Sequence, residues 1–249
     1  PTGTAILTGT VSLARSVSLE GAGMDKTKLD FSGTAHGAVT DAALMKTPVG
    51  TRVTLPALST AVKRGDKSLT FATAPSLSVG DLIALYTTAE KFSDHETYFY
   101  KAEFQRVALV TGNTVLLQGM AEDAYATTVT VYRMDDMNTC VFGGFSLVGN
   151  ADTVNVSSGL LAQYCHDVIV RGIEITNCGY AGLVLNFSDN VLLDANVISD
   201  DLVASHDLDY GLVIGGCQGV NVHGGRYVAA RHGVTIGGDG RTGEPIDRR

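Results

Sequence analysis

The stretch "GLVLNFSDNVLLDANVIS", residues 182–199, decides the fold because its apolar alternation breaks every four or five residues. The stretch "GLVIGGCQGVNVHGGRYV", residues 211–228, copies the same layout 29 residues later. Short strands that recur in a fixed order are typical of a solenoid, in which each coil stacks on its neighbours. Each strand is therefore expected to be short because it forms only one side of a coil.

Two strand signals recur in register along the second half of the chain. The segments "GLLA", "GLVL", "GLVI" and "GVTI" begin at residues 159, 182, 211 and 233, so their offsets are 23, 29 and 22. A second strand begins at residues 167, 190 and 219, with the same offsets of 23 and 29. Neither the fixed leucine frame of a leucine-rich repeat nor the strict spacing of a hexapeptide helix is present. The pattern predicts an all-β fold, a right-handed parallel β-helix.

Stacking of the coils predicts which side chains are neighbours. Adjacent coils lie about 4.8 Å apart, the ordinary spacing of paired strands. The offsets predict these columns: Cys165, Ser188 and Cys217; Gln163 and Asn186; Arg171, Asp194 and His223; Tyr180, Asp209 and Arg231; Ala181, Tyr210 and His232. We expect the first column to be an internal ladder of small side chains, and Arg171 with Asp194 to be a stacking pair rather than a site.

The length of the expected strands and the turns between them change along the chain and divide it into four parts. Residues 1–60, which include "TRVTLPAL", are expected to form the first coils and cap. Residues 61–136 have longer strands joined by "VGD" and "TGN" turns, with a hairpin signal at "TGNTVLL", and predict a small inserted antiparallel β domain. Residues 137–241 form the main coils, and residues 242–249 a polar tail. Because the chain begins at Pro1 rather than Met, we expect a fragment of a longer protein.

Composition limits the classes of function. The chain has 29 Gly, 5 Pro and no Trp, which favours strands with many tight turns. The net charge of −8 provides no basic face, so we expect no nucleic-acid binding. No apolar run is long enough to insert into a membrane, and no export signal is present. The four cysteines lack metal-site spacing and are interpreted as reduced core residues, and we expect no metal and no cofactor.

Three segments carry a resemblance to a known family. These are "VSLEGAG", "LSVGDLIALY" and, most specifically, "YGLVIGGCQGVNVHGGRYVAARHGVTIGGDG". Nearly the whole chain resembles tailspike and related tail proteins of bacteriophages that have a pectate-lyase-like right-handed β-helix. The resemblance implies a homotrimer in the virion, made in the host cytoplasm and bound to other tail or baseplate proteins. It also implies that the protein binds, and often depolymerises, a bacterial surface polysaccharide such as O-antigen or capsule.

The resemblance leaves the chemistry open. The chain has no Trp and no Trp-Ile-Asp-His strand, so calcium-dependent cleavage of pectate is not expected. Catalytic residues vary between tailspikes, so none is assigned from the family. One alternative is a structural or attachment component of the tail without catalysis. A secreted bacterial polysaccharide lyase is a further alternative, which the missing signal peptide disfavours.

The richest acidic stretch is "SDDLVASHDLDYG", residues 199–211. Its coil has 29 residues where the preceding one has 23, so six extra residues are expected to form a loop, and loops on rigid scaffolds often carry sites. Glycoside hydrolysis, which we favour over elimination, needs two carboxyl groups about 5 to 9.5 Å apart. Alternatively, Asp209 and Arg231 form a surface ion pair of under about 1 kcal/mol and the other carboxylates cap turns. The candidates are Asp201, Asp207 and Asp209 for catalysis, and His206, Tyr180, Tyr210, Arg231 and His232 for substrate binding.

Overall fold

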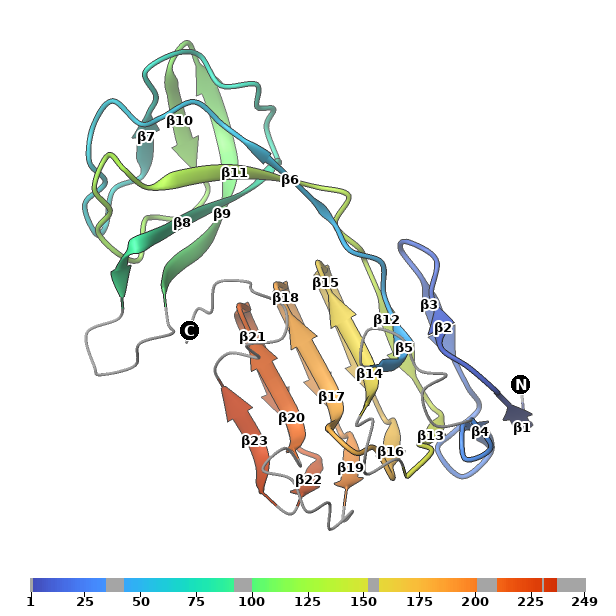
Figure 1. The fold of residues 1–249 in the computed structure, drawn as a ribbon. Coiled ribbons are helices and arrows are strands. Elements are labelled where there is room, and N and C mark those ends of the chain that lie inside the picture. The colour runs from blue at the N-terminus through green and yellow to red at the C-terminus, as the bar shows by residue number, and fades with distance from the viewer. Residues whose placement is uncertain are drawn as a thin grey trace. The chain divides into compact units, whose positions relative to one another are not determined.

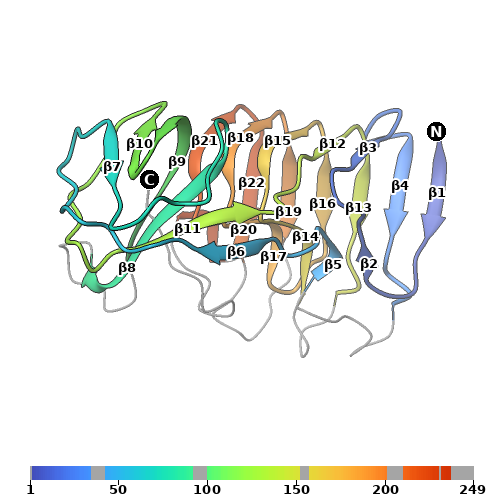
Figure 2. The ribbon, with the colours of Figure 1, turned by 90° about the horizontal axis from the view of Figure 1, so that it is seen from above.

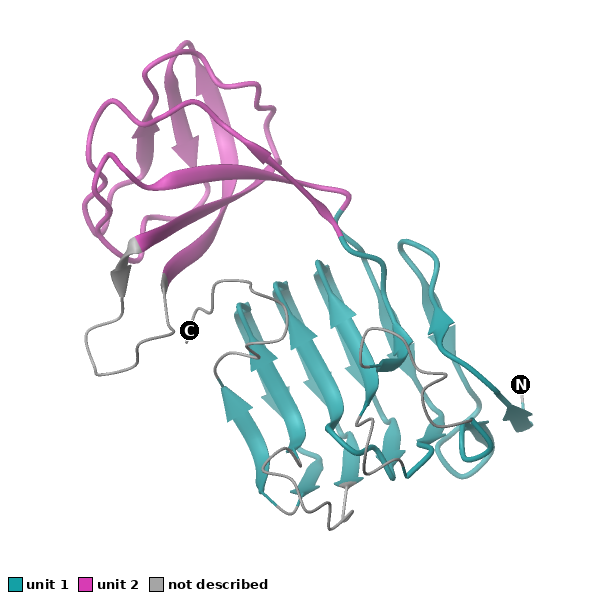
Figure 3. Cartoon of the chain, viewed as in Figure 1, with its two compact units in different colours: residues 1–49, 137–239, 248–249 teal, residues 50–136, 240–247 magenta. Residues whose placement is uncertain are grey.

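The protein is described by a computed structural model, which covers residues 2–34, 43–91, 100–151, 157–200, 210–229 and 231–236. These residues form two compact units (Figure 3). Unit 1 holds the described residues up to Val49 and from Met137 onward, and unit 2 holds those from Gly50 to Asp136. Regular structure in the described residues consists of strands, and they form no helix long and apolar enough to cross a membrane.

Unit 1 is built from three parallel sheets, which we call sheets A, B and C (Figure 1). In order of pairing, sheet A contains β1 (Gly3–Ile6), β4 (Thr27–Asp30), β13 (Ser146–Val148), β16 (Glu174–Thr176), β19 (Val197–Asp200) and β22 (Arg226–Ala229). Sheet B contains β2 (Val11–Ser12), β5 (Ala43–Lys46), β14 (Ser158–Gln163), β17 (Ala181–Asn186), β20 (Tyr210–Gly215) and β23 (His232–Ile236). Sheet C contains β3 (Ser18–Glu20), β12 (Val141–Gly143), β15 (His166–Arg171), β18 (Asp189–Asp194) and β21 (Gln218–His223).

The chain passes through sheets A, B and C in turn, so each successive strand of a sheet belongs to the next coil (Figure 2). This confirms the predicted parallel β-helix. The register also agrees with the predicted columns: Gln163 pairs with Asn186, Arg171 with Asp194, and Asp194 with His223. The register is the same from one coil to the next because every inward-facing side chain must stack on its counterpart in the next coil.

Two-residue turns between sheets B and C explain why the alternation breaks. The first residue of each turn has a left-handed backbone, with φ of 50° at Tyr164, 50° at Phe187 and 59° at Gly216. The second residue points inward and is fully buried: Cys165, Ser188 and Cys217. Each of these donates a hydrogen bond to the carbonyl oxygen two residues earlier, at 3.1, 2.9 and 3.3 Å respectively. The predicted ladder of small side chains therefore also closes the turns.

The interior of unit 1 is a continuous apolar column between the three sheets. Each coil contributes branched side chains, for example Val168, Val170, Ile173 and Ile175, all at most 1% exposed. Asn196 is one of the polar side chains of this interior, and it is also fully buried. Its Oδ1 accepts from the Ile173 amide at 3.2 Å and its Nδ2 donates to the Val170 carbonyl at 2.9 Å, so both ends of its amide are satisfied within the adjacent coil.

Unit 2 is an antiparallel sheet that interrupts the second coil between β5 and β12. In order of pairing its strands are β6 (Thr51–Thr54), β11 (Thr130–Asp135), β8 (Leu82–Lys91), β9 (Tyr100–Thr111), β10 (Thr114–Leu117) and β7 (Ser68–Thr70). The hairpin expected at "TGNTVLL" is present, because Thr114 pairs with Thr111 across Gly112, whose φ is 56°. Unit 2 has an apolar core of its own, which includes Phe71, Ile83, Val107 and Tyr125.

The start of the inserted unit differs from the sequence prediction. The prediction gave "TRVTLPAL" to the first coils, whereas Thr51–Thr54 forms β6 and pairs antiparallel with β11, with Thr51 opposite Asp135. A short strand with alternating apolar and polar residues occurs both in a coil and at the edge of an antiparallel sheet. The sequence pattern alone therefore did not distinguish the two. The inserted unit therefore begins at Gly50 rather than Ala61.

Glu103 is a carboxylate in the interior of unit 2, with 2% of its surface exposed. Its oxygens accept from the backbone amides of Glu122 and Asp123 at 3.1 Å, from Gln105 Nε2 at 3.1 Å and from the Tyr125 hydroxyl at 3.1 Å. Burial raises the pKa of Glu103 above its usual range, and these donors offset only part of that effect.

The raised pKa of Glu103 predicts a pH dependence of the stability of unit 2. Because the folded-state pKa is above the unfolded-state value, folding is favoured where the group is protonated. We expect the free energy of unfolding of unit 2 to fall as pH rises from the unfolded-state pKa through the folded-state pKa. A Glu103→Gln variant lacks this contribution, so the difference between the two proteins, measured by urea unfolding at a series of pH values, must change over that window. A pH-independent difference contradicts the prediction.

Candidate saccharide-binding site

Four of the five side chains predicted to bind substrate lie together where the strands of sheet B begin. Tyr180 directly precedes β17, Tyr210 is the first residue of β20, and Arg231 and His232 lie at the start of β23. Ala181 pairs with Tyr210, and Tyr210 pairs with His232, as the repeat offsets predict. Adjacent coils thus place the three rings side by side. We call Tyr180, Tyr210, Arg231 and His232 the aromatic ladder.

Tyr210 is the centre of the aromatic ladder. The ring centroids of Tyr180 and Tyr210 are 5.7 Å apart with the planes at 75°, an edge-to-face contact. The imidazole of His232 stacks on the other side of Tyr210, at 5.8 Å and 26°. The guanidinium carbon of Arg231 is 5.4 Å from the centroid of the Tyr210 ring, which is a cation–π distance. A ring, an imidazole and a fixed positive charge therefore converge around one tyrosine.

One end of the aromatic ladder is buried, and the other end is exposed to solvent. Tyr180 is 5% exposed, Tyr210 is half-buried, and Arg231 and His232 are exposed. Both tyrosines pack on an apolar cluster on the outer face of sheet B, which consists of Ala43, Leu161, Ala181, Val184 and Val213. The rings are held by packing, so little side-chain entropy is lost when a ligand binds them.

The chemistry of the ladder suits a sugar. An aromatic ring presents an apolar face with a polar edge, and a tyrosine hydroxyl or an imidazole nitrogen exchanges hydrogen bonds with hydroxyl groups. The guanidinium of Arg231 is always charged, and its fork of N–H groups matches a carboxylate. The exposed end of the ladder can therefore hold a ring that carries hydroxyl and acidic groups.

The other predicted site residues lie outside the described residues. These are Asp201, Asp207 and Asp209, expected to be catalytic, and His206, expected to bind substrate. The predicted column of Tyr180, Asp209 and Arg231, and the alternative of a surface ion pair between Asp209 and Arg231, both stay predictions. Among the described residues, no three His, Cys, Asp or Glu side chains are grouped so that they could hold a metal ion.

The arginine predicted to stack on Asp194 makes its ion pair in the opposite direction. Arg171 Nη2 is 2.7 Å from Glu20 Oε2, although β12 lies between their strands. The residue of β12 in this column is Gly143, which pairs with both Glu20 and Arg171. A Cβ at Gly143 would lie 3.1 Å from Arg171 Cγ, so the arginine crosses the space that a side chain would occupy. Its hydrogen bond lowers the pKa of Glu20.

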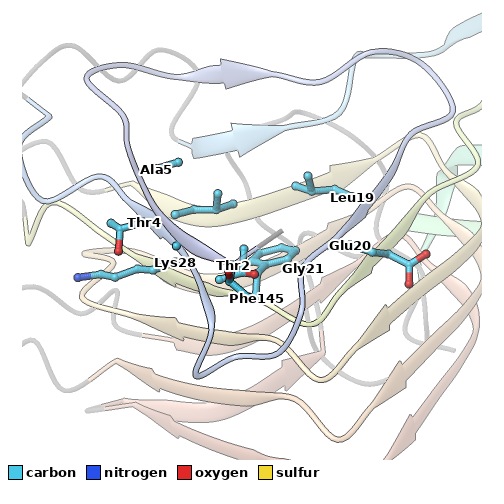
Figure 4. A pocket seen from close by; sticks show the side chains of 11 residues that line it. Thr2, Thr4, Ala5, Leu19, Glu20, Gly21, Lys28 and Phe145 are labelled. Carbon is cyan, nitrogen blue, oxygen red and sulfur yellow. The ribbon is translucent and has the colours of Figure 1, made fainter.

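A pocket at the first coil is separate from the ladder. Its apolar lining comes from Ala5, Leu19, Leu29 and Phe145, and Figure 4 shows Glu20 and Lys28 directed to opposite sides of it. Both charges are engaged elsewhere, Glu20 with Arg171 and Lys28 with Asp30 at 2.8 Å. The hydrogen bond from Lys28, together with those from Ser32, lowers the pKa of Asp30 to about 2. The pocket therefore has an apolar character, unlike the ladder.

Comparisons with known proteins agree with this architecture. Residues 176–246 match the family model described as Gp49, pectin lyase-like, and residues 48–134 match the model described as tailspike protein-like, Ig-like domain. No curated protein sequence matches the chain. The second match covers nearly the same residues as unit 2.

Solved structures of three tailspikes are similar to the chain. Tailspike gp49 of Pseudomonas phage LKA1 is 25% identical with a TM-score of 0.82, and tailspike gp61 of Pseudomonas phage phi297 is 23% identical with a TM-score of 0.78. Tailspike gp54 of Acinetobacter baumannii phage AP22, solved in complex with A. baumannii capsular saccharide, is 24% identical with a TM-score of 0.76. Each alignment covers 96% of this chain but only 38% or 39% of the tailspike. The resemblance to phage tailspikes with a pectate-lyase-like fold is thus confirmed.

Proposed function

We propose that this chain is part of a phage tailspike that binds a bacterial surface polysaccharide, O-antigen or capsule, during host recognition. The observation that carries the proposal is the aromatic ladder, in which Tyr180, Tyr210, His232 and Arg231 converge at one end of sheet B. The saccharide complex of the AP22 tailspike supports this class of ligand.

The proposed complex places one sugar ring against the open side of the ladder. The ring stacks on the exposed edge formed by Tyr210 and His232, and its hydroxyl groups exchange hydrogen bonds with the imidazole. Arg231 pairs with a carboxylate on the same or the next sugar. An acidic polysaccharide is therefore the preferred ligand, because Arg231 supplies a local positive charge at the ladder that offsets the repulsion from the net charge of −8 of the chain.

We propose that the polysaccharide is also depolymerised near the ladder. Asp201, Asp207 and Asp209 occupy the nine residues that precede Tyr210 in the sequence, and they supply the candidate carboxyl groups. Two of them would act as acid and as base or nucleophile in hydrolysis. We also propose that the full-length protein is a homotrimer in the virion, joined to other tail or baseplate proteins. Light scattering of the full-length protein tests the trimer, and a monomer would contradict it.

The activity is tested with purified surface polysaccharides from a panel of bacterial hosts. Reducing ends and the absorbance of unsaturated uronates are followed together. Reducing ends alone indicate hydrolysis, and both signals indicate elimination. Asp201→Asn, Asp207→Asn and Asp209→Asn, made one at a time, then identify the carboxylates. Binding without either signal, on a panel that contains the true host, would favour the role of an attachment component without catalysis.

A Tyr210→Ala variant tests the ladder. We expect its affinity for the polysaccharide, measured by isothermal titration calorimetry, to fall about tenfold, because an aromatic contact contributes about 1.4 kcal/mol. Tyr132→Ala is the matched control, since Tyr132 is a half-buried tyrosine of unit 2 that also has a ring neighbour, Tyr86, at 6.4 Å. Unchanged affinity of Tyr210→Ala, with the control also unchanged, would move the binding site away from the ladder.

A further inference from the structure

Three polar side chains near the start of strands β12 and β15 of sheet C form a second arrangement with a possible chemistry. Asn138 and Cys165 face each other across adjacent coils and are fully buried. The residues that follow them, Thr139 and His166, therefore face outward, and Asp167 comes next in the chain. Thr139 is exposed, and the side chains of His166 and Asp167 are 30% and 51% exposed. All three are accessible to a ligand, and none belongs to the aromatic ladder.

The three side chains form a series of contacts that runs from Thr139 through His166 to Asp167. Thr139 Oγ1 is 3.5 Å from His166 Nε2, and His166 Nδ1 is 2.9 Å from Asp167 Oδ2. A single tautomer satisfies both contacts: the Nδ1–H donates to the carboxylate, and Nε2 accepts from the hydroxyl. This is the order of nucleophile, base and orienting group that activates a hydroxyl for attack, in which the contact between nucleophile and base is often looser without substrate.

The orienting carboxylate is itself held in place by the next coil. Asp167 has a left-handed backbone, with φ of 56°, which aspartate tolerates better than most residues. Asn190 Nδ2 donates to Asp167 Oδ1 at 2.6 Å, so each carboxylate oxygen has its own donor. The imidazole is therefore fixed from the adjacent strand β18, and Asp167 is a positioning residue that acts through His166.

We propose that Thr139 and His166 hydrolyse acyl esters, such as O-acetyl groups on sugar hydroxyls. An activated hydroxyl beside an imidazole performs acyl transfer, whereas cleavage of a glycosidic bond needs a pair of carboxyl groups. The backbone N–H of Thr139 donates to Ser16 Oγ at 3.5 Å, so the substrate has to displace the serine hydroxyl before this N–H can stabilise the oxyanion formed by attack of the Thr139 side chain.

The reaction balances with water as the only co-substrate. Thr139 Oγ1 bonds to the carbonyl carbon of the ester while its proton passes to His166 Nε2. The bond to the sugar oxygen then breaks, and that oxygen takes the proton from His166. Water attacks the resulting acyl-threonine, its proton passes to His166 Nε2, and the collapse of the intermediate returns that proton to Thr139 and releases the carboxylic acid. A polysaccharide as the natural source of the ester rests on the function proposed above, but the ester chemistry does not.

The test uses the whole chain and 4-nitrophenyl acetate, with release of nitrophenolate as the signal. We expect Thr139→Val and His166→Asn to lower kcat/KM at least about 100-fold, as loss of a nucleophile or its base does. Thr139→Ser should retain activity. Asp167→Asn should lower kcat and leave KM unchanged, because it disturbs the tautomer and not the binding of the ester. The acyl-threonine should be detectable as a mass increment on the peptide that holds Thr139.

Matched controls separate this site from general surface effects and from the proposed function. His223→Asn changes another exposed histidine of sheet C, and Thr54→Val changes an exposed threonine of unit 2, so both should retain wild-type rates. If Thr139→Val keeps wild-type activity, or if the wild type is no faster than His166→Asn, the proposal is wrong, whatever the polysaccharide assays show.

Discussion

Replacing Gly211 by alanine is expected to destabilise the β-helix by about 3 kcal/mol, the upper range of overpacking in a filled interior. A Cβ at this position would lie 2.5 Å from the carbonyl oxygen of Gly233 in the next coil. No heavy-atom contact of that kind is tolerated, and a backbone oxygen cannot rotate away as a side chain can. The two coils would have to separate, which strains the hydrogen bonds between β20 and β23.

The same restriction explains why each repeat begins with glycine. A Cβ at Gly159 would lie 2.7 Å from the carbonyl oxygen of Gly182, and one at Gly182 would lie 3.2 Å from that of Gly211. The glycines at this position form a column in which each Cα faces the backbone of the next coil. The glycine that marks the repeat in the sequence is thus required by close approach of backbones.

Hydrogen exchange of intact Gly211→Ala, read by mass spectrometry on peptides from β17 and β20, measures the effect within unit 1. Gly9→Ala is the matched control, because no heavy atom lies within 4 Å of a Cβ at that position and its φ is not in the left-handed region. We expect the control to change stability by less than about 0.5 kcal/mol. Equal protection in Gly211→Ala and Gly9→Ala would show that the coils can separate at no cost.

The columns of stacked residues are predictable from the sequence because the coil imposes one register. The offsets of 23 and 29 place Gln163 beside Asn186 and Tyr210 beside Ala181, and the structure shows both pairs. The 29-residue coil keeps the same register as the 23-residue coil, because its extra residues leave the strands of sheet B in step. The contact of Tyr210 with His232 follows from this one rule, and Tyr180 lies beside them because it precedes Ala181.

Contacts that depend on a missing side chain or on a local change of register are not predictable in this way. Arg171 reaches Glu20 because Gly143 leaves its place in the column empty, and no pattern in the sequence states which neighbour an arginine selects. Val141 pairs with Ile169 at an offset of 28 residues, which would place Thr139 beside Asp167, but Asn138 pairs with Cys165 at an offset of 27. Only the register of Asn138 with Cys165 brings the hydroxyl and the imidazole onto adjacent coils.

The acidic half of the candidate site rests on the sequence alone. The predicted carboxylates fall in the segment from Asp201 to Asp209, outside the described residues, whereas Tyr210 and His232 begin strands whose register fixes them. A strand is constrained by two neighbours, while the geometry of a long connection depends on contacts that its own sequence does not reveal. This is the physical reason that four of the five predicted binding residues have a defined position, whereas His206 and the three predicted catalytic residues stay predictions.

Replacing Glu103 by alanine is expected to lower the free energy of unfolding of unit 2 by at least about 3 kcal/mol, since each buried donor left without a partner costs about 1 to 3 kcal/mol. The backbone amides of Glu122 and Asp123 and the hydroxyl of Tyr125 would all lose their acceptor. Glu103→Gln should cost less than alanine, because its amide oxygen still accepts while its NH₂ group faces other donors. Tyr125→Phe should cost about 1 kcal/mol, since it removes one donor and leaves the acceptor paired.

Tyr125→Phe, Glu103→Gln and Glu103→Ala form a series in which progressively more of the hydrogen bonding to the Glu103 carboxylate is lost. Hydrogen exchange of peptides from β9 and β10 reports unit 2, and peptides from β17 report unit 1 as an internal reference. Glu20→Gln, a change at an exposed carboxylate of unit 1, should leave unit 2 unaffected. The order of stability should be wild type, Tyr125→Phe, Glu103→Gln and Glu103→Ala. If Glu103→Ala is as stable as Tyr125→Phe, water must replace the carboxylate as acceptor, and Glu103 would not organise the turn that holds Glu122 and Asp123.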